Sequence, residues 1–336
     1  MPPVIVKRLS VTRAAVCALA FAVISVLGAG SVVAQQYPNR MVRIINPFPP
    51  GGGGDLLGRL FGERLSKMWG QPVVVESKPG AASIIATDFV AKAAPDGHTL
   101  LLTSDASITS NPHLYPKLPY DALRDLAPIT QLIGSNMVVA VHPSLPVNSI
   151  AELVTLAKAK PRTLNYASYG AGSQPHLFFE GLNAQTGIDI AHVPYKGLAP
   201  AITATMAGEV QTTLASAAIA AGQIQSGRLK ALAITRADRS PLMPELPTLK
   251  DAGFSNLDPR VWFGLFAPGA TPPAIVRKIQ QDIAQILSDP DFREREMNRR
   301  GYTPGGSTPE EFAAFIKEDF EFKGRVIKTL GIKPDS

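Results

Sequence analysis

The sequence predicts an α/β protein of two similar lobes, each built on a mostly parallel sheet flanked by helices. Short runs rich in Val, Ile and Leu alternate with helical patterns along the chain. The order of glycine loop, helix, glycine stop and strand occurs twice, from Gly54 to Gly70 and, about 120 residues later, from Gly172 to Gly187. A length of 336 residues and a hydrophobic content of 45% suffice for ordered cores. Two such lobes can face each other across a ligand cleft.

Residues 1–34 have the pattern of a cleaved export signal. Three basic residues and no acid precede an uncharged run over 14–30, and small residues at Val32 and Ala34 favour cleavage after Ala34. An uncleaved anchor helix is the alternative, although the run is slightly short of a membrane span. Cleavage removes three of the 33 basic residues and the only cysteine, so the net charge falls from +6 to +3. The exported chain is then thiol-free and near neutral, which excludes a disulfide framework and a multi-thiolate zinc site.

The first lobe opens with a strand–helix–strand–helix–strand pattern. Its first helix is the clearest, because Leu57, Phe61 and Leu65 recur on one face at helical spacing. Gly70 ends that helix. The expected elements are a strand over 42–45, a helix over 55–68, a strand over 72–76, a helix near 84–93 and a strand over 99–103.

The second lobe repeats this pattern. Gly187 and Gly208 end its two helices. The expected elements are a strand over 164–168, a helix over 175–186, a strand over 188–193, a helix near 200–207 and a strand over 210–214.

The remaining segments connect the lobes and complete the first one. Residues 137–142 read as a crossover strand, followed by a helix from Ile150 whose start has the Ser149/Glu152 capping box. A return strand covers 261–266, with Trp262 in the core. Two final helices, over 272–287 with Thr271 as cap and from a capping box at 308–311, are expected on the first lobe. The lobes are therefore assigned to 35–138 with 262–336, and to 139–261.

The strongest local feature is the loop that runs from Phe48 through Pro50 to Asp55. Its four glycines, Gly51, Gly52, Gly53 and Gly54, expose backbone N–H groups where a helix begins, and such groups attract anions. A nucleotide-binding loop would continue with Gly-Lys-Ser/Thr, and this one does not. A carboxylate fits better, a plain surface turn is the alternative, and Asp55 itself either contacts a ligand or caps the helix.

The loop over 169–176 is the counterpart in the second lobe. It resembles a dinucleotide fingerprint, but Pro175 stands where the third glycine belongs and Asp189 begins rather than ends the next strand. No nicotinamide, flavin or other cofactor is therefore predicted. As an anion loop it is plausible, because Ser168 and Ser173 add hydroxyl donors.

Catalytic and metal-binding patterns are weak. The nucleophile-elbow motif is absent, and the five histidines lack metal-ligand spacing, so neither a catalytic residue nor a metal site is predicted. His176, at a loop–helix junction, suits a hydrogen-bonding or capping role better than general-base work. An exported hydrolase using Ser168 or Ser173 with His176 remains an alternative.

Three further features bear on a ligand or a partner. Lys196 either pairs with an anionic ligand or is solvated, and Tyr195 is a possible wall of a ligand site. The arginine-rich stretch 293–300 lacks interleaved aromatics, so it reads as a solvated helix face, and no nucleic-acid partner is expected.

The motifs together resemble those of the substrate-binding proteins of tripartite tricarboxylate transporters, the Bug family. The resemblance covers nearly the whole exported chain, in order. The motifs are Tyr37-Pro-Asn-Arg, Pro50-Gly-Gly-Gly-Gly-Asp55, Pro72-Val-Val-Val-Glu76, Lys78-Pro-Gly80, Ala94-Pro-Asp-Gly97, Asn111-Pro-His-Leu-Tyr115, Pro194-Tyr-Lys-Gly197, Gly227-Arg-Leu-Lys-Ala-Leu-Ala233, Trp262-Phe-Gly264 and Ala267-Pro-Gly269. The resemblance implies a periplasmic binding protein of the two-lobed type II class that closes on a small carboxylate and delivers it to membrane permease subunits.

The resemblance also implies where the ligand is held. Ligand contacts are expected on the first glycine loop, on the loop after the third strand, on the second-lobe loop and near the Pro-Tyr-Lys-Gly turn. The candidate residues are Phe48, Pro50, Gly51, Gly52, Gly53, Asp55, Ser104, Ser107, Ser168, Gly170, Ser173, His176, Tyr195, Lys196 and Ser216.

One departure from the family pattern bears on the ligand. Many relatives have an aspartate at the end of the strand that follows Gly-Glu-Val, where this chain has Ala215 and then Ser216. A ligand ammonium group would lack a charged partner there, which is unfavourable in a buried site. We therefore expect a mono- or dicarboxylic acid without an amino group, bound by a monomer. A scaffold or signalling protein without a small ligand is a third possibility.

Overall fold

The computed structural model describes residues 37–51, 53–235, 243–254, 257 and 260–334. Residues 1–39 and 40–336 form separate units, and every helix and strand named below belongs to the second. The expected export signal over 1–34 and Gly52 lie outside the described residues. Among the helices of the described ranges, none combines the length and the apolar character needed to cross a membrane.

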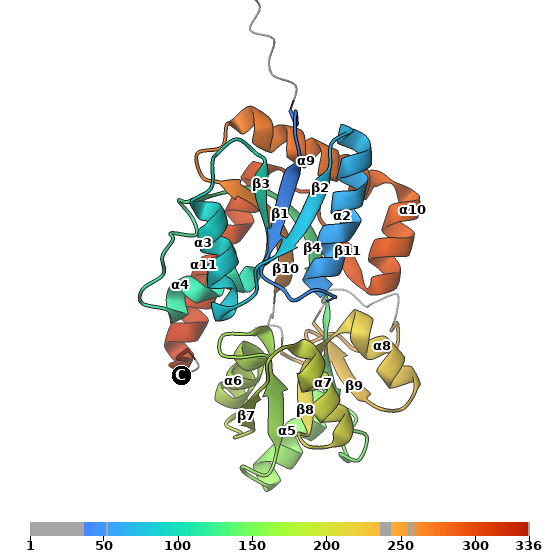
Figure 1. Ribbon diagram of the computed structural model, residues 1–336. Coiled ribbons are helices and arrows are strands. Elements are labelled where there is room, and N and C mark those ends of the chain that lie inside the picture. The colour runs from blue at the N-terminus through green and yellow to red at the C-terminus, as the bar shows by residue number, and fades with distance from the viewer. Residues whose placement is uncertain (1–36, 52, 236–242, 255–256, 258–259, 335–336) are drawn as a thin grey trace, which may run out of the picture. The chain divides into compact units, whose positions relative to one another are not determined.

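The first sheet has six strands in the order β11-β4-β10-β3-β1-β2 (Figure 1). β1, β2, β3 and β4 point one way, and β10 and β11 the other, so the sheet is mostly parallel. The strands are β1 (Val42–Asn46), β2 (Val73–Ser77), β3 (Thr99–Ser104), β4 (Leu126–Ser135), β10 (Val261–Pro268) and β11 (Tyr302–Pro304).

Helices pack on both faces of this sheet. α9 and α11 both contact β4, as expected for the two C-terminal helices, and Trp262 is buried in an apolar cluster with Phe266 and Phe312. The helical segments are α2 (Gly53–Trp69), η1 (Ala81–Ser83), α3 (Ile84–Ala91), η2 (Ala106–Ser110), α4 (Asn111–Leu114), α9 (Pro273–Ser288), α10 (Pro290–Phe292), η3 (Arg293–Met297), η4 (Asn298–Arg300) and α11 (Pro309–Leu330).

Helix caps confirm one sequence prediction and correct another. Thr308 accepts a hydrogen bond from the Glu311 N–H while the Glu311 carboxylate accepts one from the Thr308 N–H, which is the expected capping box of α11. The cap residue of α9 is Pro272 rather than Thr271, because the helix begins one residue later than predicted. Thr271 is buried instead.

The second sheet has five strands in the order β7-β6-β8-β5-β9, of which only β5 runs against the others. The strands are β5 (Met137–Val141), β6 (Asn165–Ser168), β7 (Ala191–Pro194), β8 (Thr212–Ser216) and β9 (Lys230–Ile234). The helices are α5 (Ile150–Ala159), α6 (Gln174–Thr186), α7 (Leu198–Ala207) and α8 (Ala217–Gln225).

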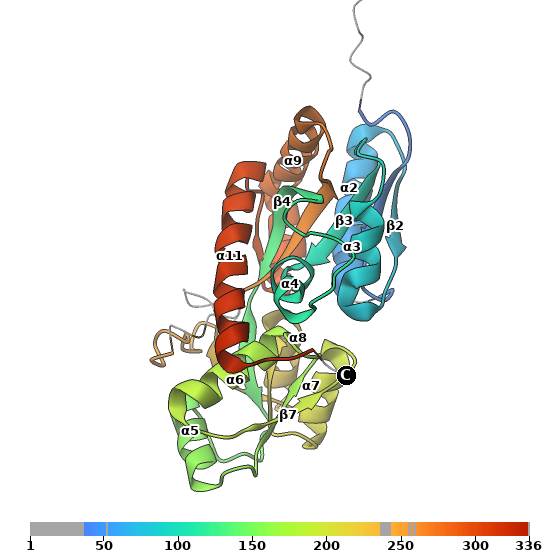
Figure 2. The same ribbon diagram turned by 90° about the vertical axis from the view of Figure 1, so that its left-hand side faces the viewer.

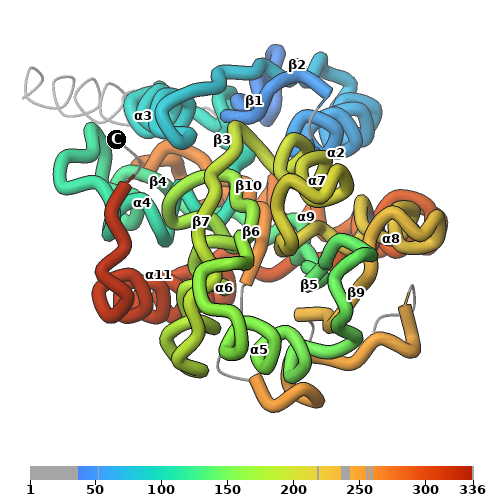
Figure 3. Tube along the Cα trace, turned by 90° about the horizontal axis from the view of Figure 1, so that it is seen from below, coloured from blue at the N-terminus to red at the C-terminus, as the bar shows by residue number. Residues whose placement is uncertain are grey.

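The central strand β5 is buried on both faces, which explains its unbroken apolar sequence. Met137, Val139 and Val141 join the cluster under α5 and α6, whereas Val138 and Ala140 join the one under α7 and α8. Figure 3, seen from below, shows α5 and α6 lying apart from α8 around this sheet.

The predicted doubling is present in the topology. β1-α2-β2-α3-β3 in one sheet and β6-α6-β7-α7-β8 in the other each place the first strand between the other two. β4 passes into β5 through the single residue Asn136, and the chain returns to the first sheet at Val261.

Candidate functional site

The candidate residues follow strand ends that share one edge of each sheet. β1, β2 and β3 are parallel, so their carboxyl ends lie together, and Ser104 closes β3. β6, β7 and β8 are likewise parallel, and Ser168 and Ser216 close two of them. Such carboxyl edges, where helices begin, are where α/β sheets bind ligands. In Figure 1 these two edges face each other.

The first glycine loop packs tightly at its end. The Phe48 N–H donates to Asn46 Oδ1 at 2.8 Å, and the Phe48 ring lies 5.5 Å from that of Phe263. A Cβ at Gly54 would come within 2.0 Å of the Phe48 ring, so this glycine permits the ring to rest on the helix start. Pro50, Gly51 and Gly53 are exposed.

Asp55 holds the loop together. Its Oδ2 accepts hydrogen bonds from the Gly51 N–H at 3.0 Å and from Arg59 Nε at 2.9 Å. The Arg59 bond lowers the pKa of the Asp55 carboxyl below its usual value of 3.8, against the opposing effect of burial. These contacts are those of a carboxylate that shapes the loop.

The two serines after β3 have different surroundings. Ser104 is half-buried at the strand end. Ser107 is fully buried in the π-helical turn η2, where its Oγ lies 2.7 Å from Thr103 Oγ1. Between them, buried Asp105 contacts the side chains of Lys323 and Gln174, and burial raises the pKa of Asp105 while Lys323 opposes that rise.

In the second-lobe loop, Ser168 and His176 hold the backbone. Ser168 Oγ lies 2.5 Å from His192 Nε2 and accepts from the Gly170 N–H at 3.1 Å. His176 Nδ1 accepts from the Gly172 N–H at 3.1 Å, the hydrogen-bonding role expected from the sequence. The His176 and His192 rings stack with centroids 4.1 Å apart.

Ser173 differs from these residues. It occupies the N-cap position of α6, yet its side chain makes no capping bond. It is only 6% exposed, and among the described residues its Oγ has no hydrogen-bond partner. Ser173 is therefore not paired with His176, and its hydroxyl is available at a helix N-terminus that favours anions.

The remaining candidates border this loop. The Tyr195 N–H donates to the Ser168 carbonyl at 2.9 Å. Burial is the main cause that raises the pKa of the Tyr195 hydroxyl, and the negative charge of Glu209 adds to it. Lys196 is exposed. Ser216 is half-buried at the start of α8, where its side chain makes no capping bond.

The structure thus joins Ser168, Gly170 and Tyr195 by hydrogen bonds and places Ser104 and Ser107 on either side of Asp105. Sequence reasoning missed Asp105, Gln174 and Lys323. The ion pair between Asp319 and Lys323 could have been predicted from the sequence. The two residues are four positions apart in a helix, where an acidic and a basic side chain lie close enough to pair.

Two hollows are formed by the described residues, one beside the second-lobe loop and one away from both loops. One of about 380 Å³ lies between α6 and α11 and includes Gln174, Phe178, Lys323 and Val326 in its wall. The other, of about 600 Å³, lies on the second lobe around Lys230 and 243–246. Within the described ranges, His, Cys, Asp and Glu form no group of three or more suited to a metal ion.

Comparisons with known proteins agree on one family. A family profile described as "Tripartite tricarboxylate transporter family receptor" matches residues 57–332. Protein BugT of Bordetella pertussis is 35% identical over 306 residues, covering 91% of this chain and 94% of BugT.

Two similar solved structures hold carboxylic acids. The R. palustris protein Rpa4515, solved with adipate, is 32% identical, with a TM-score of 0.82 and coverage of 89% of this chain and 100% of that one. MatC from Rhodopseudomonas palustris, with bound malate, is 29% identical, with a TM-score of 0.77 and coverage of 87% and 100%. Nothing in these comparisons supports the hydrolase alternative.

Proposed function

This chain belongs to the tripartite tricarboxylate transporter receptor family, and we propose that it is a periplasmic protein that captures a small organic carboxylate between its lobes. We assign residues 35–136 with 261–336 to one lobe and 137–260 to the other, because β5 begins at Met137 in the second sheet and β10 begins at Val261 in the first. After removal of 1–34 the monomer delivers its ligand to the permease subunits of such a transporter. The adipate and malate bound by two related proteins support this class of ligand.

The observation that carries the proposal is the buried hydroxyl of Ser173 at the N-terminus of α6, which lacks a partner among the described residues. A buried hydroxyl without a partner is unfavourable unless a ligand satisfies it. The dipole of α6 favours an anion at this point. A ligand carboxylate satisfies both conditions.

The ligand we propose is a mono- or dicarboxylic acid without an amino group. Ala215 is fully buried and Ser216 is neutral, so the end of β8 has no carboxylate to pair with an ammonium group. The first glycine loop and Ser104 supply neutral donors from the other lobe, with Lys196 and Tyr195 at the border.

A melting-temperature panel tests this function. Adipate and malate are added to the full-length protein, with glutamate and aspartate as the amino-acid comparison. A ligand that binds only the folded state raises the melting temperature, by several degrees at 100 times its Kd. A shift with glutamate or aspartate, and none with simple acids, would contradict the proposed ligand class.

The variant Ser173→Ala locates the site. Its unliganded melting temperature should stay within about 1 °C of the natural protein, because the hydroxyl bonds no described residue. Loss of a hydrogen bond to a charged ligand should weaken binding roughly ten- to a hundredfold by calorimetric titration. Ser226→Ala is the matched control, since Ser226 is exposed and its side chain bonds only the carbonyls of Gly222 and Gln223 and the neighbouring side chain of Arg228. Equal affinity in Ser173→Ala and the control would place the ligand elsewhere.

A further inference from the structure

A buried cluster of charges lies behind the candidate site. The side chains of Lys323, Asp105 and Asp319 are 1%, 3% and 0% exposed. Lys323 Nζ contacts Asp105, lies 3.1 Å from Asp319 Oδ2 and donates to Thr109 Oγ1 at 3.1 Å. Trp262 Nε1 also donates to Asp319, at 3.0 Å. Charges so deeply buried are stable only when they are paired and hydrogen-bonded.

The cluster reaches the other lobe through one side chain. Gln174, the first residue of α6, donates from Nε2 to Asp105 Oδ2 and to the Arg260 carbonyl at 3.1 Å. A glutamine amide nitrogen has two hydrogens, and both are used by these acceptors. The Gln174 amide nitrogen therefore fixes α6 against the segments that carry η2 and β10, and has no hydrogen left for a ligand.

The positions of these residues connect the two halves of the candidate site. Asp105 stands between Ser104 and Ser107, and Gln174 directly follows Ser173. α11, which carries Lys323, contacts β4, η2 and α6 (Figure 2). One hydrogen-bonded chain thus links the donors of the first lobe to the N-terminus of α6.

We propose that Gln174 and Lys323 are positioning residues that set the distance between the two halves of the carboxylate site. Lys323 orients Asp105, and Asp105 holds Gln174, so the Ser173 hydroxyl keeps a fixed place relative to the first-lobe donors. The expected change in ligand affinity rests on the proposed function. The expected change in lobe position does not depend on any ligand.

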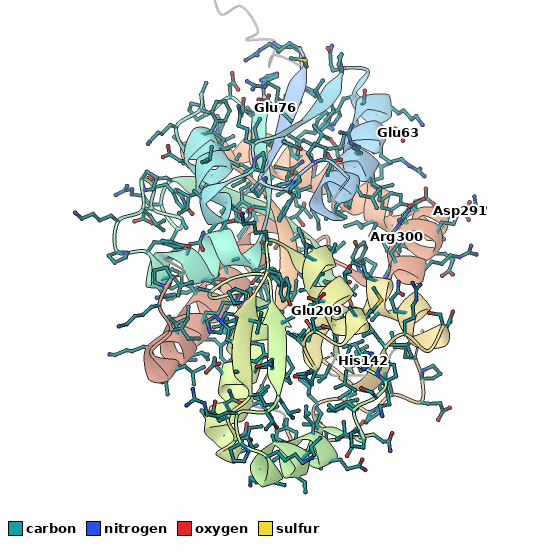
Figure 4. The ribbon with its side chains drawn as sticks, turned by 60° about the horizontal axis from the view of Figure 1, so that its bottom comes forward. Glu63, Glu76, His142, Glu209, Asp291 and Arg300 are labelled. Carbon is teal, nitrogen blue, oxygen red and sulfur yellow. The ribbon has the colours of Figure 1, made fainter. Side chains whose placement is uncertain are left out.

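The first experiment measures lobe position without ligand. Spin labels are placed at Glu63→Cys on α2, which Figure 4 labels, and at Lys158→Cys on α5, both exposed, with Cys17→Ser to remove the natural thiol. We expect Gln174→Leu to broaden the distance distribution between the labels. Gln185→Leu is the matched control, because Gln185 lies in the same helix and the same hollow but is exposed, and it should leave the distribution unchanged. Equal distributions in Gln174→Leu and the natural protein would overturn the proposal.

A second variant pair tests the contact itself. Gln174→Glu sets a carboxylate against Asp105 and should broaden the distribution. In the double variant Gln174→Glu with Asp105→Asn, the amide at position 105 can donate to the carboxylate at position 174. The contact again has one donor and one acceptor, so the distribution of distances between the labels should narrow. A double variant as broad as Gln174→Glu alone would contradict the proposal.

Calorimetric titration with adipate gives the effect on binding. Gln174→Leu should weaken adipate affinity about tenfold, whereas Gln185→Leu should leave it unchanged. Unchanged affinity in Gln174→Leu would overturn the positioning role. If the natural protein does not bind adipate or malate, the proposed carboxylate function fails, and the label distances still decide whether Gln174 sets lobe position.

Discussion

At the residue scale, the candidate polar side chains divide into those that shape the loops and those left for a ligand. Asp55, Ser168 and His176 each bond backbone N–H groups of their own loop. Ser173 does not, although it is buried. A bound carboxylate therefore meets loops whose shape is set by their own side chains, and this preorganisation lowers the entropy lost on binding.

Asp55→Asn tests loop shaping through its pH dependence. The folded-state pKa of Asp55 is below 3.8, so its ionised form stabilises the protein above the unfolded-state value, and that contribution is lost as the pH falls through the folded-state pKa. We expect the variant to lose about 1 kcal/mol of unfolding free energy at pH 7 and to approach the natural protein near pH 3. Urea unfolding at both pH values measures this difference.

Asp189→Asn serves as the control for that experiment. Asp189 lies 3.5 Å from Arg162 with both side chains exposed, so its removal should change stability little. A loss in Asp55→Asn that is the same at pH 7 and pH 3 would show that the charge of Asp55 does not hold the loop.

At the element scale, α11 depends on a close approach to β10. A Cβ at Gly264 would lie 2.4 Å from the Phe312 ring, and Phe312 is fully buried with its ring edge-on to Trp262 at 5.3 Å. The glycine therefore lets a helix carrying bulky aromatic side chains lie against the sheet.

Gly264→Ala should lower the free energy of unfolding by about 1–3 kcal/mol, because the added methyl group overpacks this contact. Gly222→Ala is the matched control with the opposite expected sign. Gly222 lies in α8 with open space around a Cβ, so alanine should stabilise the helix by about 1 kcal/mol. Chemical unfolding of both variants gives the comparison, and equal stability of Gly264→Ala and the natural protein would show that α11 can shift.

The elements also show which features of the fold could be read from the sequence. The helix predicted over 55–68 is α2 at Gly53–Trp69, because its apolar spacing and glycine stop are both local. β4 was missed, since Leu126–Ser135 contains Pro128 and Gly134 and has no clear alternation. β7 begins at Ala191 rather than at Ile188, because Ile188 and Ile190 are buried without pairing in the strand.

For the site, the loops were predictable and the links between them were not. Glycines at strand ends mark the two candidate loops within a few residues of sequence. Asp105 meets Gln174 and Lys323 across 69 and 218 positions, and no local pattern predicts such contacts. Only the folded chain shows which polar groups satisfy one another.

At the scale of the whole unit, the lobes share several contacts. β4 and β5 are separated by one residue, Asn136. The side-chain amide of Asn136 donates to the Gly301 carbonyl at 3.1 Å, and the backbone carbonyl of Asn136 accepts from the Ala217 N–H at 2.8 Å. Leu114, Leu177 and Ile327 form a small apolar cluster that joins α4, α6 and α11. These contacts couple the two lobes mechanically.

We therefore expect the two lobes to unfold together. Differential scanning calorimetry should give one transition, with the calorimetric enthalpy equal to the van't Hoff enthalpy, and a bound acid should raise the whole transition. Two resolved peaks, of which only one responds to adipate, would show that the lobes are independent.

The arrangement of the two sheets along the chain has a consequence for biogenesis. The second sheet is built from one continuous stretch, 137–234, whereas the first needs β10 and β11, which come after 260. When the chain emerges N-terminus first, the second sheet can be complete while β3 still lacks its neighbour β10. The early strands then expose an open edge, which is a template for aggregation. Folding of this protein should accordingly depend on chaperones that protect this open edge until the last quarter of the chain has arrived.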